Sequence, residues 1–229
     1  MTADKKKYIN YDILGAKYQL PLVDSGSKTK EHILMQSTIL FAKKGFASVS
    51  MRELAEVIGI KPASLYNHFE SKETLWEAVL THASDLYLLY FRHLNDSLEG
   101  ARSFKEVVDV MFLEPEKFSN LFTCYAFCLV QSEQFRDERS GGIFCGTFLE
   151  YSINFIKGWF DKCVERDQAA PFDTKTVATF FMHSVLIGIN VKVQEALGRP
   201  TPYDPTVMIG ELHQYILDNA ARRAREQAG

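Results

Sequence analysis

The chain has 229 residues, a length that fits one large domain or two smaller ones, either long enough to bury a hydrophobic core. Its composition, with 46% hydrophobic and 24% charged residues, excludes disordered, collagen-like and low-complexity proteins. The net charge of −3 argues against a protein that coats nucleic acid indiscriminately, but residues 1–80 hold 11 Lys and Arg against 9 Asp and Glu. The first third of the chain is therefore the part suited to meeting phosphate.

The cysteines and the N-terminus indicate a protein of a reducing compartment. Four cysteines are too few for a disulfide framework, and they lack the paired CxxC spacing of structural zinc sites. The N-terminus has no apolar stretch of signal-peptide length. The longest uncharged stretches, 118–132 and 176–191, are shorter than the roughly 20 apolar residues of a membrane-spanning helix. We expect a cytoplasmic protein that does not cross a membrane.

Motifs for catalysis or metal binding are missing from the sequence. It has no Gly-rich phosphate loop, nucleophile elbow or suitably placed carboxylate pair, and its six histidines form no metal motif. We expect neither an enzyme nor a cofactor. Cys124 and Cys128, four residues apart, admit a redox or soft-metal site, but no cation flanks them to lower a thiol pKa. Two buried cysteines in a hydrophobic core are the simpler interpretation.

The spacing of apolar residues predicts an all-α protein, because helical periodicity recurs through most of the chain and few alternating runs appear. Residues 1–27 contain Gly, Pro and Ser without a sustained period and predict an irregular N-terminal arm. A first helix is expected over about 28–44, ended by Gly45 in the left-handed conformation. Its buried side is expected to hold Ile33, Ser37, Leu40 and Phe41.

Two short helices joined by a tight turn are predicted next. Ser50-Met51-Arg52-Glu53 has the form of a capping box, in which the Ser50 hydroxyl accepts from the Glu53 amide and the Glu53 carboxylate returns to the Ser50 amide. Gly59 ends the first of these helices. Pro62 suits the first position of the second, because its missing N–H would be unpaired there in any case.

The second short helix is predicted to present a small, polar and aromatic face. Leu65 and Phe69 lie four residues apart and point inward. The residues left largely outside are Ala63, Ser64, Tyr66, Asn67 and His68. A face of this kind is suited to a groove of DNA.

In this region the chain resembles the N-terminal DNA-binding domain of the tetracycline-repressor-like (TetR/AcrR) transcriptional regulators. The resemblance covers about 28–80 and rests on an ordered series of motifs: "LFAKKGF", "S-x-R-E-L-A-x-x-x-G-I", "SLYNHF" and "SKETL". It departs at Lys61, where many members carry Ser or Thr, so that Pro62 alone sets the helix start. Residues 81–229 match the family only in length and all-helical character.

The resemblance implies two domains after the arm. Residues 28–75 would form a three-helix DNA-binding domain with a helix-turn-helix, and residues 76–229 a larger helical domain for effector binding and dimerisation. In the second domain, helices are expected at about 72–98, 103–113, 116–138, 144–166, 174–197 and 205–226, with breaks at Glu114-Pro115 and Gly141-Gly142 and with Asp204 and Pro205 opening the last one.

The resemblance also implies two kinds of DNA contact. By position, the phosphate-contacting residues are Ser50, Arg52, Lys61, Tyr66, His68 and Lys72, and the base-facing residues are Ala63, Ser64 and Asn67. Five of these residues have a plainer alternative. Capping alone explains Ser50, ordinary solvated charges explain Arg52 and Lys72, and a packed aromatic and a solvated imidazole explain Tyr66 and His68.

In the resembled family the C-terminal domain dimerises through a late pair of helices, which by order are 144–166 and 174–197 here. The second contains Ser184 and Gly188, four residues apart, with Ala178 nearby, and small residues let another helix approach closely. Internal packing is the alternative. In a dimer, two recognition helices about 34 to 36 Å apart would read a palindromic operator in successive major grooves.

A cavity for a small-molecule effector is expected among residues 82–135. The candidate contacts are Phe112, Phe122, Tyr125, Phe127 and Cys128, with His82 and Tyr87 as polar groups. Aromatic residues at helical spacing also pack as ordinary core without a ligand. Their number favours an apolar or aromatic effector.

The sequence thus predicts a homodimeric transcriptional regulator, a repressor released from a palindromic double-stranded operator by a small molecule. The alternative is an all-helical small-molecule or lipid-binding protein that makes no use of DNA, and an enzyme stands third. Salt-sensitive, sequence-selective DNA binding would identify the regulator. Uptake of hydrophobic ligands without such DNA binding would identify the small-molecule or lipid-binding protein, and turnover of a substrate would identify an enzyme.

Overall fold

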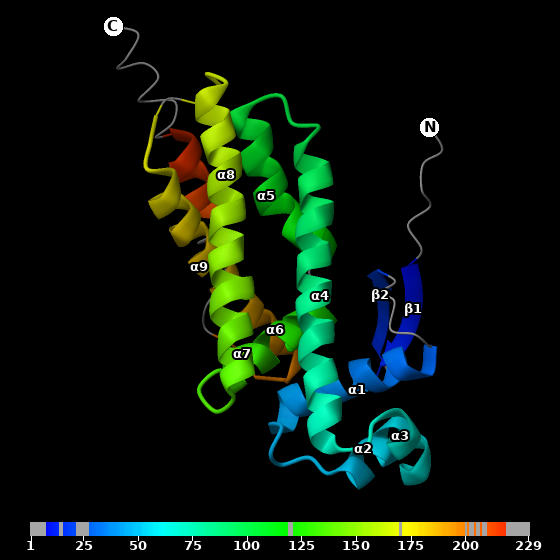
Figure 1. The fold of residues 1–229 in the computed structure, drawn as a ribbon. Coiled ribbons are helices and arrows are strands. Elements are labelled where there is room, and N and C mark those ends of the chain that lie inside the picture. The colour runs from blue at the N-terminus through cyan, green and yellow to red at the C-terminus, as the bar shows by residue number, and fades with distance from the viewer. Residues whose placement is uncertain are drawn as a thin grey trace, which may run out of the picture. The chain divides into compact units, whose positions relative to one another are not determined.

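A computed structural model describes residues 8–13, 16–21, 28–118, 121–169, 171–199, 201, 204, 207 and 210–218. Side chains are described from Thr29 onward, except those of residues 112–118. Figure 1 labels the helices and strands along the chain. The chain forms two compact units, each built from separate stretches. Unit 1 comprises residues 1–88 and 120–144, and unit 2 comprises residues 89–119 and 145–229.

A two-stranded antiparallel sheet occupies part of the N-terminal arm. Strands β1 (Tyr8–Ile13) and β2 (Ala16–Pro21) pair so that Ile9 lies opposite Leu20 and Tyr11 opposite Tyr18. The prediction of an irregular arm is wrong for these residues. Each strand alternates apolar with other residues in steps of two, and the register brings the apolar positions opposite one another. The remainder of the arm lies outside the described residues.

The described chain from residue 28 onward is helical, which confirms the predicted all-α class. Helix α1 (Lys28–Lys44) ends at Gly45, which has φ +82° as predicted. One buried side was expected for this helix, but every residue from 33 to 41 is buried. The reason is tertiary: α1 packs against β1, α2 and α6, so that neighbours cover several of its faces.

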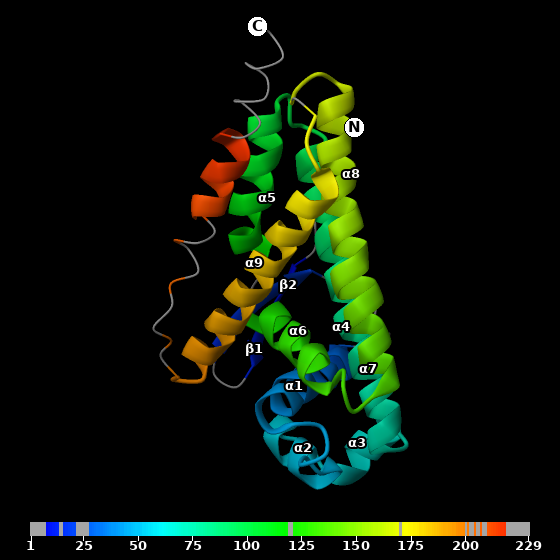
Figure 2. The ribbon, with the colours of Figure 1, turned by 90° about the vertical axis from the view of Figure 1, so that its left-hand side faces the viewer.

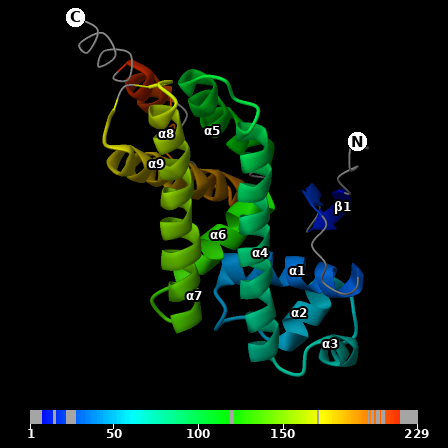
Figure 3. The ribbon, with the colours of Figure 1, turned by 45° about the horizontal axis from the view of Figure 1, so that its top comes forward.

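The remaining helices of unit 1 come from two stretches of the chain. Helices α2 (Met51–Ile58) and α3 (Pro62–His68) lie side by side below α1 (Figure 3), followed by α4 (Lys72–Leu98), whose first part belongs to this unit. Helices α6 (Leu121–Glu133) and α7 (Glu138–Gly142) return to the unit from later in the sequence. Unit 1 is therefore held together by contacts between residues far apart in the chain.

A cluster of aromatic rings joins the start of the helix pair to the rest of unit 1. The Phe46 ring centroid lies 5.4 Å from that of Phe41 and 4.6 Å from that of Trp76. The Phe46 backbone N–H also donates to Oε1 of Glu133, the last residue of α6, over 3.3 Å. The loop between α1 and α2 is thereby held from α1, α4 and α6 together.

The Gly141-Gly142 break is a wrong prediction, because both glycines lie in helix α7. A Cβ on Gly141 would come within 3.0 Å of the Gln134 backbone oxygen. Gly141 is thus required by the close approach of another backbone segment and not by a loop. Next along the chain come a π-helical segment, η1 (Ile143–Glu150), and α8 (Tyr151–Glu165), where a helix over 144–166 was predicted.

Unit 2 contains the later part of α4, α5 (Phe104–Phe118), α8 and α9 (Thr174–Ala196). The break predicted at Glu114-Pro115 is wrong, since α5 runs through Pro115. A proline inside a helix removes its own N–H bond to the preceding turn and crowds the carbonyl four residues earlier, but α5 continues on both sides of Pro115. The bounds of α9 agree with the predicted 174–197.

Helices α8 and α9 pack side by side (Figure 2) and are tied near the start of α9. The Thr174 hydroxyl donates to Oδ1 of Asp161 over 2.6 Å, and Lys157 Nζ lies 2.5 Å from Oδ2 of the same carboxylate. These hydrogen bonds, led by that of Lys157, hold the pKa of Asp161 below its ordinary value. Asp161 is therefore a charged tie between the two helices at neutral pH.

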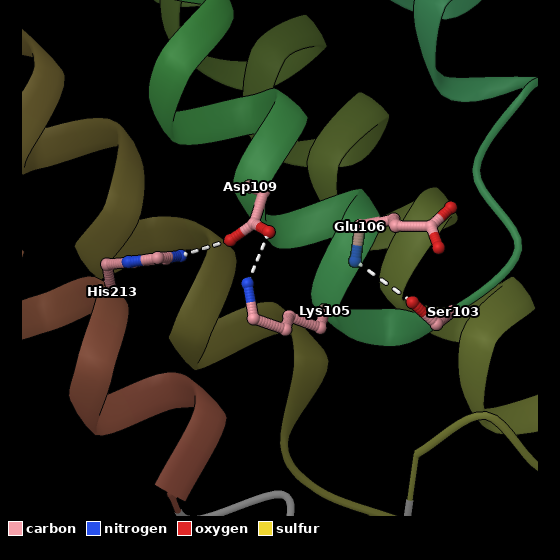
Figure 4. A network of polar contacts seen from close by, with 5 residues as sticks. All are labelled: Ser103, Lys105, Glu106, Asp109 and His213. Carbon is pink, nitrogen blue, oxygen red and sulfur yellow. Dashed lines mark hydrogen bonds and ion pairs between the residues drawn. The ribbon is translucent and has the colours of Figure 1, made fainter.

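A polar network attaches the last described helical stretch, 210–218, to α5 (Figure 4). Asp109 accepts from His213 Nε2 over 2.9 Å, and Lys105 Nζ lies 2.5 Å from its second oxygen. Burial alone would raise the pKa of Asp109, but the two hydrogen bonds outweigh it and the pKa is lowered. The predicted helix over 205–226 is thus described only in this part, and Pro205 lies outside the described residues.

Helix α9 buries two of its small residues together with large ones such as Phe181, and leaves other large residues exposed. Ala178 and Ser184 are buried within unit 2, whereas Phe180 is 63% exposed and Ile187 40%. For the small residues, internal packing is therefore the observed arrangement. By length and composition α9 is apolar enough to cross a membrane, a test that core helices of soluble proteins also pass, and a third of its most apolar stretch is buried.

Candidate nucleic-acid interface

The capping residues predicted for α2 are in place. Ser50 is the N-cap, and its hydroxyl accepts from the Glu53 N–H over 3.2 Å. The Glu53 carboxylate pairs with Lys44 Nζ at 2.5 Å. The pKa of Glu53 is lowered, first by the hydrogen bond from Lys44 and to a smaller extent by the Ser50 backbone. Glu53 therefore closes the capping box and also ties α2 to the end of α1.

The turn between α2 and α3 follows from three consecutive signals. Gly59 caps α2 with φ +78°, a conformation that favours glycine. Lys61 precedes α3 without a side-chain capping bond, and Pro62 occupies the first turn of α3. Lys61 has no hydroxyl group that could cap α3, as the sequence indicated, and its side chain is exposed beside the start of the helix.

Helix α3 is anchored through one side only. Leu65 is fully buried, and Phe69, which caps the helix, is also buried. Of the predicted outward set, Ala63, Asn67 and His68 are exposed, Tyr66 is 49% exposed, and Ser64 is half-buried. The structure therefore brings the predicted base-facing and aromatic residues onto one short, accessible helix.

The remaining predicted phosphate contacts flank that helix. Ser50 and Arg52 are exposed at the start of α2. Lys72, at the start of α4, is half-buried: its Nζ lies 4.3 Å from the Phe46 ring centroid and donates to the Ala47 carbonyl over 3.4 Å. Lys72 therefore has a structural role, and its phosphate contact stays a prediction.

The start of α4 adds two hydroxyl residues that the sequence interpretation missed. Ser71 accepts from the Thr74 N–H over 3.0 Å, and the two hydroxyls lie 3.0 Å apart. A Ser followed three residues later by a residue whose amide it caps is the signal that identifies such a helix start. Together with Lys72 they surround the N-terminus of a long helix, a place where backbone N–H groups favour anions.

The predicted effector contacts fall into two groups within unit 1. The His82 ring lies 6.2 Å from Phe122, and Tyr87 lies 6.2 Å from Phe127, so that these four residues join α4 to α6. Tyr125 instead lies against α1, with Lys43 Nζ 5.6 Å from its ring. The Phe112 side chain lies outside the described residues.

The cysteines of α6 have the character of core residues. Cys124 is buried and Cys128 is half-buried. Burial, with a smaller contribution from Cys124, raises the pKa of Cys128 to about 12. A thiol of this kind is a poor nucleophile at neutral pH. Within the part of the chain that the structure describes, no three His, Cys, Asp or Glu side chains gather as a metal site.

Comparison with known proteins finds relatives of the segment that contains α2 and α3. The family profile for bacterial regulatory proteins of the tetR family matches residues 33–79. The uncharacterized HTH-type transcriptional regulator YerO of Bacillus subtilis is 34% identical over 74 residues, 32% of this chain and 26% of the relative. The HTH-type transcriptional regulator UidR of Escherichia coli is 35% identical over 72 residues, 31% of this chain and 35% of the relative. The matched stretch thus spans about a quarter to a third of these relatives.

The fold extends the likeness beyond that segment. The TetR family transcriptional regulator PfmR from Thermus thermophilus superposes with a TM-score of 0.60 at 19% identity, over 81% of this chain and 97% of that one. At this identity the agreement concerns the fold, which has an N-terminal helix-turn-helix and a helical remainder.

Proposed function

This chain belongs, through residues 33–79, to the tetR family of bacterial regulatory proteins, and we propose that it is a sequence-specific DNA-binding transcriptional regulator. The observation that carries the proposal is the accessible face of α3, a short helix anchored by Leu65 and Phe69 and preceded by a tightly capped α2. A second helix presented in this way fits the major groove. Such a regulator acts in the cytoplasm, where bacterial DNA lies.

The residues of α3 divide between reading bases and holding phosphates. Asn67 suits a bidentate hydrogen bond to an adenine edge, and Ala63 and Ser64, near the start of α3, suit close approach to the bases. Tyr66 and His68 lie beside them as phosphate contacts. The other phosphate contacts in this proposal are Ser50, Arg52, Lys61 and Lys72, at the starts of α2, α3 and α4.

We also propose that the regulator is a homodimer formed through α8 and α9. The exposed Phe180 and Ile187 lie about two turns apart on α9, and water-exposed apolar residues at helical spacing favour a second helix. Tyr151, at the start of α8, is exposed as well. Two copies related by a twofold axis would present two α3 helices to a palindromic operator.

The functional division proposed here assigns residues 28–75 to DNA and residues 76–229 to the effector and the dimer. It does not follow the two compact units, because α6 and α7 pack into unit 1 with the DNA-binding helices. A small molecule held between α4 and α6 would therefore act on the unit that carries α3. An apolar or aromatic effector fits the rings of Phe122, Tyr87 and Phe127.

Release from DNA would then be a shift of population. In one conformational state the two recognition helices are too far apart to bind the operator, and the effector binds this state more tightly. The effector therefore lowers the population of the DNA-competent state, and this shift cannot exceed the ratio of the effector's affinities for the two states. Helix α4 is the mechanical link in this proposal, because it begins beside α3 at Lys72 and carries His82 three turns later. On this basis the regulator is a repressor.

The experiment is fluorescence anisotropy of the purified protein with duplexes tiled across its own upstream region, at two salt concentrations. We expect one duplex to bind far more tightly than a scrambled control. Asn67→Ala is expected to lose about 1 to 3 kcal/mol of discrimination at one base pair. Lys72→Ala is expected to weaken all duplexes alike and to reduce the salt slope by about one.

Other outcomes contradict the proposal. Equal, weak binding of every duplex would favour a small-molecule or lipid-binding protein that makes no use of DNA. An unchanged salt slope in Lys72→Ala would remove Lys72 from the phosphate contacts and leave it with its contacts to Phe46 and Ala47.

A further inference from the structure

His82 of α4 is a buried polar residue in aromatic surroundings. Its side chain is 4% exposed, and its ring centroid lies 6.2 Å from that of Phe122 on α6. Neither Nδ1 nor Nε2 has a hydrogen-bond partner among the described residues. Gln36 and Ser37 on α1 each have one such atom, but in His82 both polar atoms of the side chain are left without a partner.

Two unpaired buried nitrogens are costly, since buried polar groups are almost always hydrogen-bonded. Burial lowers the pKa of His82 to about 4, so the ring is neutral at physiological pH. A neutral imidazole offers one N–H donor and one acceptor nitrogen. Phenylalanine fills much the same space without this cost, as Phe122 does nearby, so histidine at this position indicates a polar partner.

The surroundings restrict the charge of that partner. Phe122, the α6 residue whose ring faces His82, is fully buried and brings no counter-charge. An ion placed here would lose its hydration without compensation. A hydroxyl group, in contrast, pairs with either ring nitrogen, because it both donates and accepts.

We propose that His82 is the polar contact for the effector, and that the effector is an uncharged, mainly apolar molecule with a hydroxyl group that hydrogen-bonds to the ring. This inference rests on the proposed regulator function and deepens it by naming the ligand chemistry. The rings joining α4 to α6 supply the apolar contacts, and His82 discriminates the hydroxyl.

The test uses pairs of probes that differ by a methyl group in place of the hydroxyl: 2-naphthol with 2-methylnaphthalene, and 1-hexanol with heptane. Equilibrium dialysis measures Kd for the full-length wild type and for His82→Phe, with His82→Leu as a second variant if the first does not fold. His183→Phe is the matched control, because His183 is exposed on α9 and hydrogen-bonds within its own helix.

For at least one pair we expect the ratio of the methyl Kd to the hydroxyl Kd to fall about tenfold in the His82 variants and to stay unchanged in His183→Phe. Binding of the methyl probe is expected to persist in all proteins. An equal ratio in wild type and His82 variants would overturn the proposal, as for a ring satisfied by buried water alone. Failure of both pairs to bind would overturn the ligand class.

The same preparations separate this inference from the proposed function. Sequence-selective DNA binding is measured without any probe. If none of the proteins binds DNA selectively, the proposed regulator function is contradicted, and the ratio of the methyl Kd to the hydroxyl Kd still tests whether His82 contacts the ligand. Selective DNA binding together with an unchanged ratio contradicts the site alone.

Discussion

The helix pair α2–α3 and the layer formed by the first part of α4 with α6 and α7 share one compact unit but are specified in different ways. In the pair, Ser50, Gly59 and Pro62 set each helix end through groups a few residues away. In the layer, the decisive contacts depend on how separate segments pack: His82 of α4 meets Phe122 of α6, and Gly141 meets the Gln134 carbonyl across a short loop. Local capping can thus be predicted from the sequence, whereas packing between layers cannot. Four predictions test this contrast, in order of expected effect.

The largest effect is expected where the helix pair depends on the core. Leu65 is fully buried, so Leu65→Ala is expected to cost about 2 to 5 kcal/mol of unfolding free energy, from lost burial and a residual cavity. Urea unfolding measures it. The exposed neighbour Asn67 provides the control, since Asn67→Ala is expected to change stability by about 0.5 kcal/mol or less. Equal effects of the two would mean that α3 is not anchored through Leu65.

His82 is expected to make the layer sensitive to acid. Its pKa is about 4 in the folded chain against 6.5 ordinarily, so between these values the unfolded chain takes up a proton that the folded chain does not. Stability therefore falls as the pH is lowered from 6.5, by at most about 3 kcal/mol, and His82→Phe abolishes this part of the loss. At pH 7 the variant is expected to gain about 1 to 2 kcal/mol. Unfolding curves from pH 7 to 5 that run parallel for both proteins would contradict this.

The two glycines of α7 are expected to respond in opposite directions. Gly141→Ala places a Cβ against a backbone oxygen and is expected to cost about 1 to 3 kcal/mol, whereas Gly142 has open space around its Cβ position. Gly142→Ala is expected to stabilise the helix by about 0.5 to 1 kcal/mol. Thermal unfolding of the two variants measures the contrast. Equal stabilisation of both would show that the Gln134 backbone yields to the new methyl group.

The smallest effect concerns Ser50, where capping and DNA contact are to be separated. Ser50→Ala removes the bond to the Glu53 N–H and is expected to cost about 1 kcal/mol. Ser50→Asp preserves the cap, because aspartate caps as well as serine, but places a negative charge before the phosphates. We expect Ser50→Asp to keep its melting temperature and to lose affinity for every duplex. Unchanged affinity would leave Ser50 with capping alone.

The predicted DNA-facing set was accessible to sequence reasoning because its determinants are close together in the chain. Leu65 and Phe69 identify the buried side of α3, and the exposed residues follow by helical geometry. Lys72 shows the limit of this reasoning: its contact with Phe46 depends on how the α1–α2 loop returns to α4. The hydroxyls of Ser71 and Thr74 were missed although their capping signal is present in the sequence.

Beyond the helix pair, sequence patterns failed where a residue type has two structural uses. Pro115 and Gly141-Gly142 were interpreted as breaks, but α5 accommodates the proline, and α7 uses a glycine for close backbone approach. In the arm, each run in which apolar residues alternate with other residues is only six residues long, too short to be recognised as a strand. The two runs form a sheet because β1 pairs with β2. In the predicted effector set, only the fold separates Tyr125, which faces α1, from the residues that join α4 to α6.

By itself, therefore, the sequence determined the helical class, the capped helix pair and the accessible face of α3, because hydrogen bonds and apolar spacing within a few residues decide each of them. Only the tertiary structure decided that α1 is covered on several faces and that Ala178 and Ser184 pack internally on α9. It also decided that His82 lies buried with no hydrogen-bond partner among the described residues. Burial and hydrogen-bond satisfaction depend on which distant segments meet, and no local pattern carries that information.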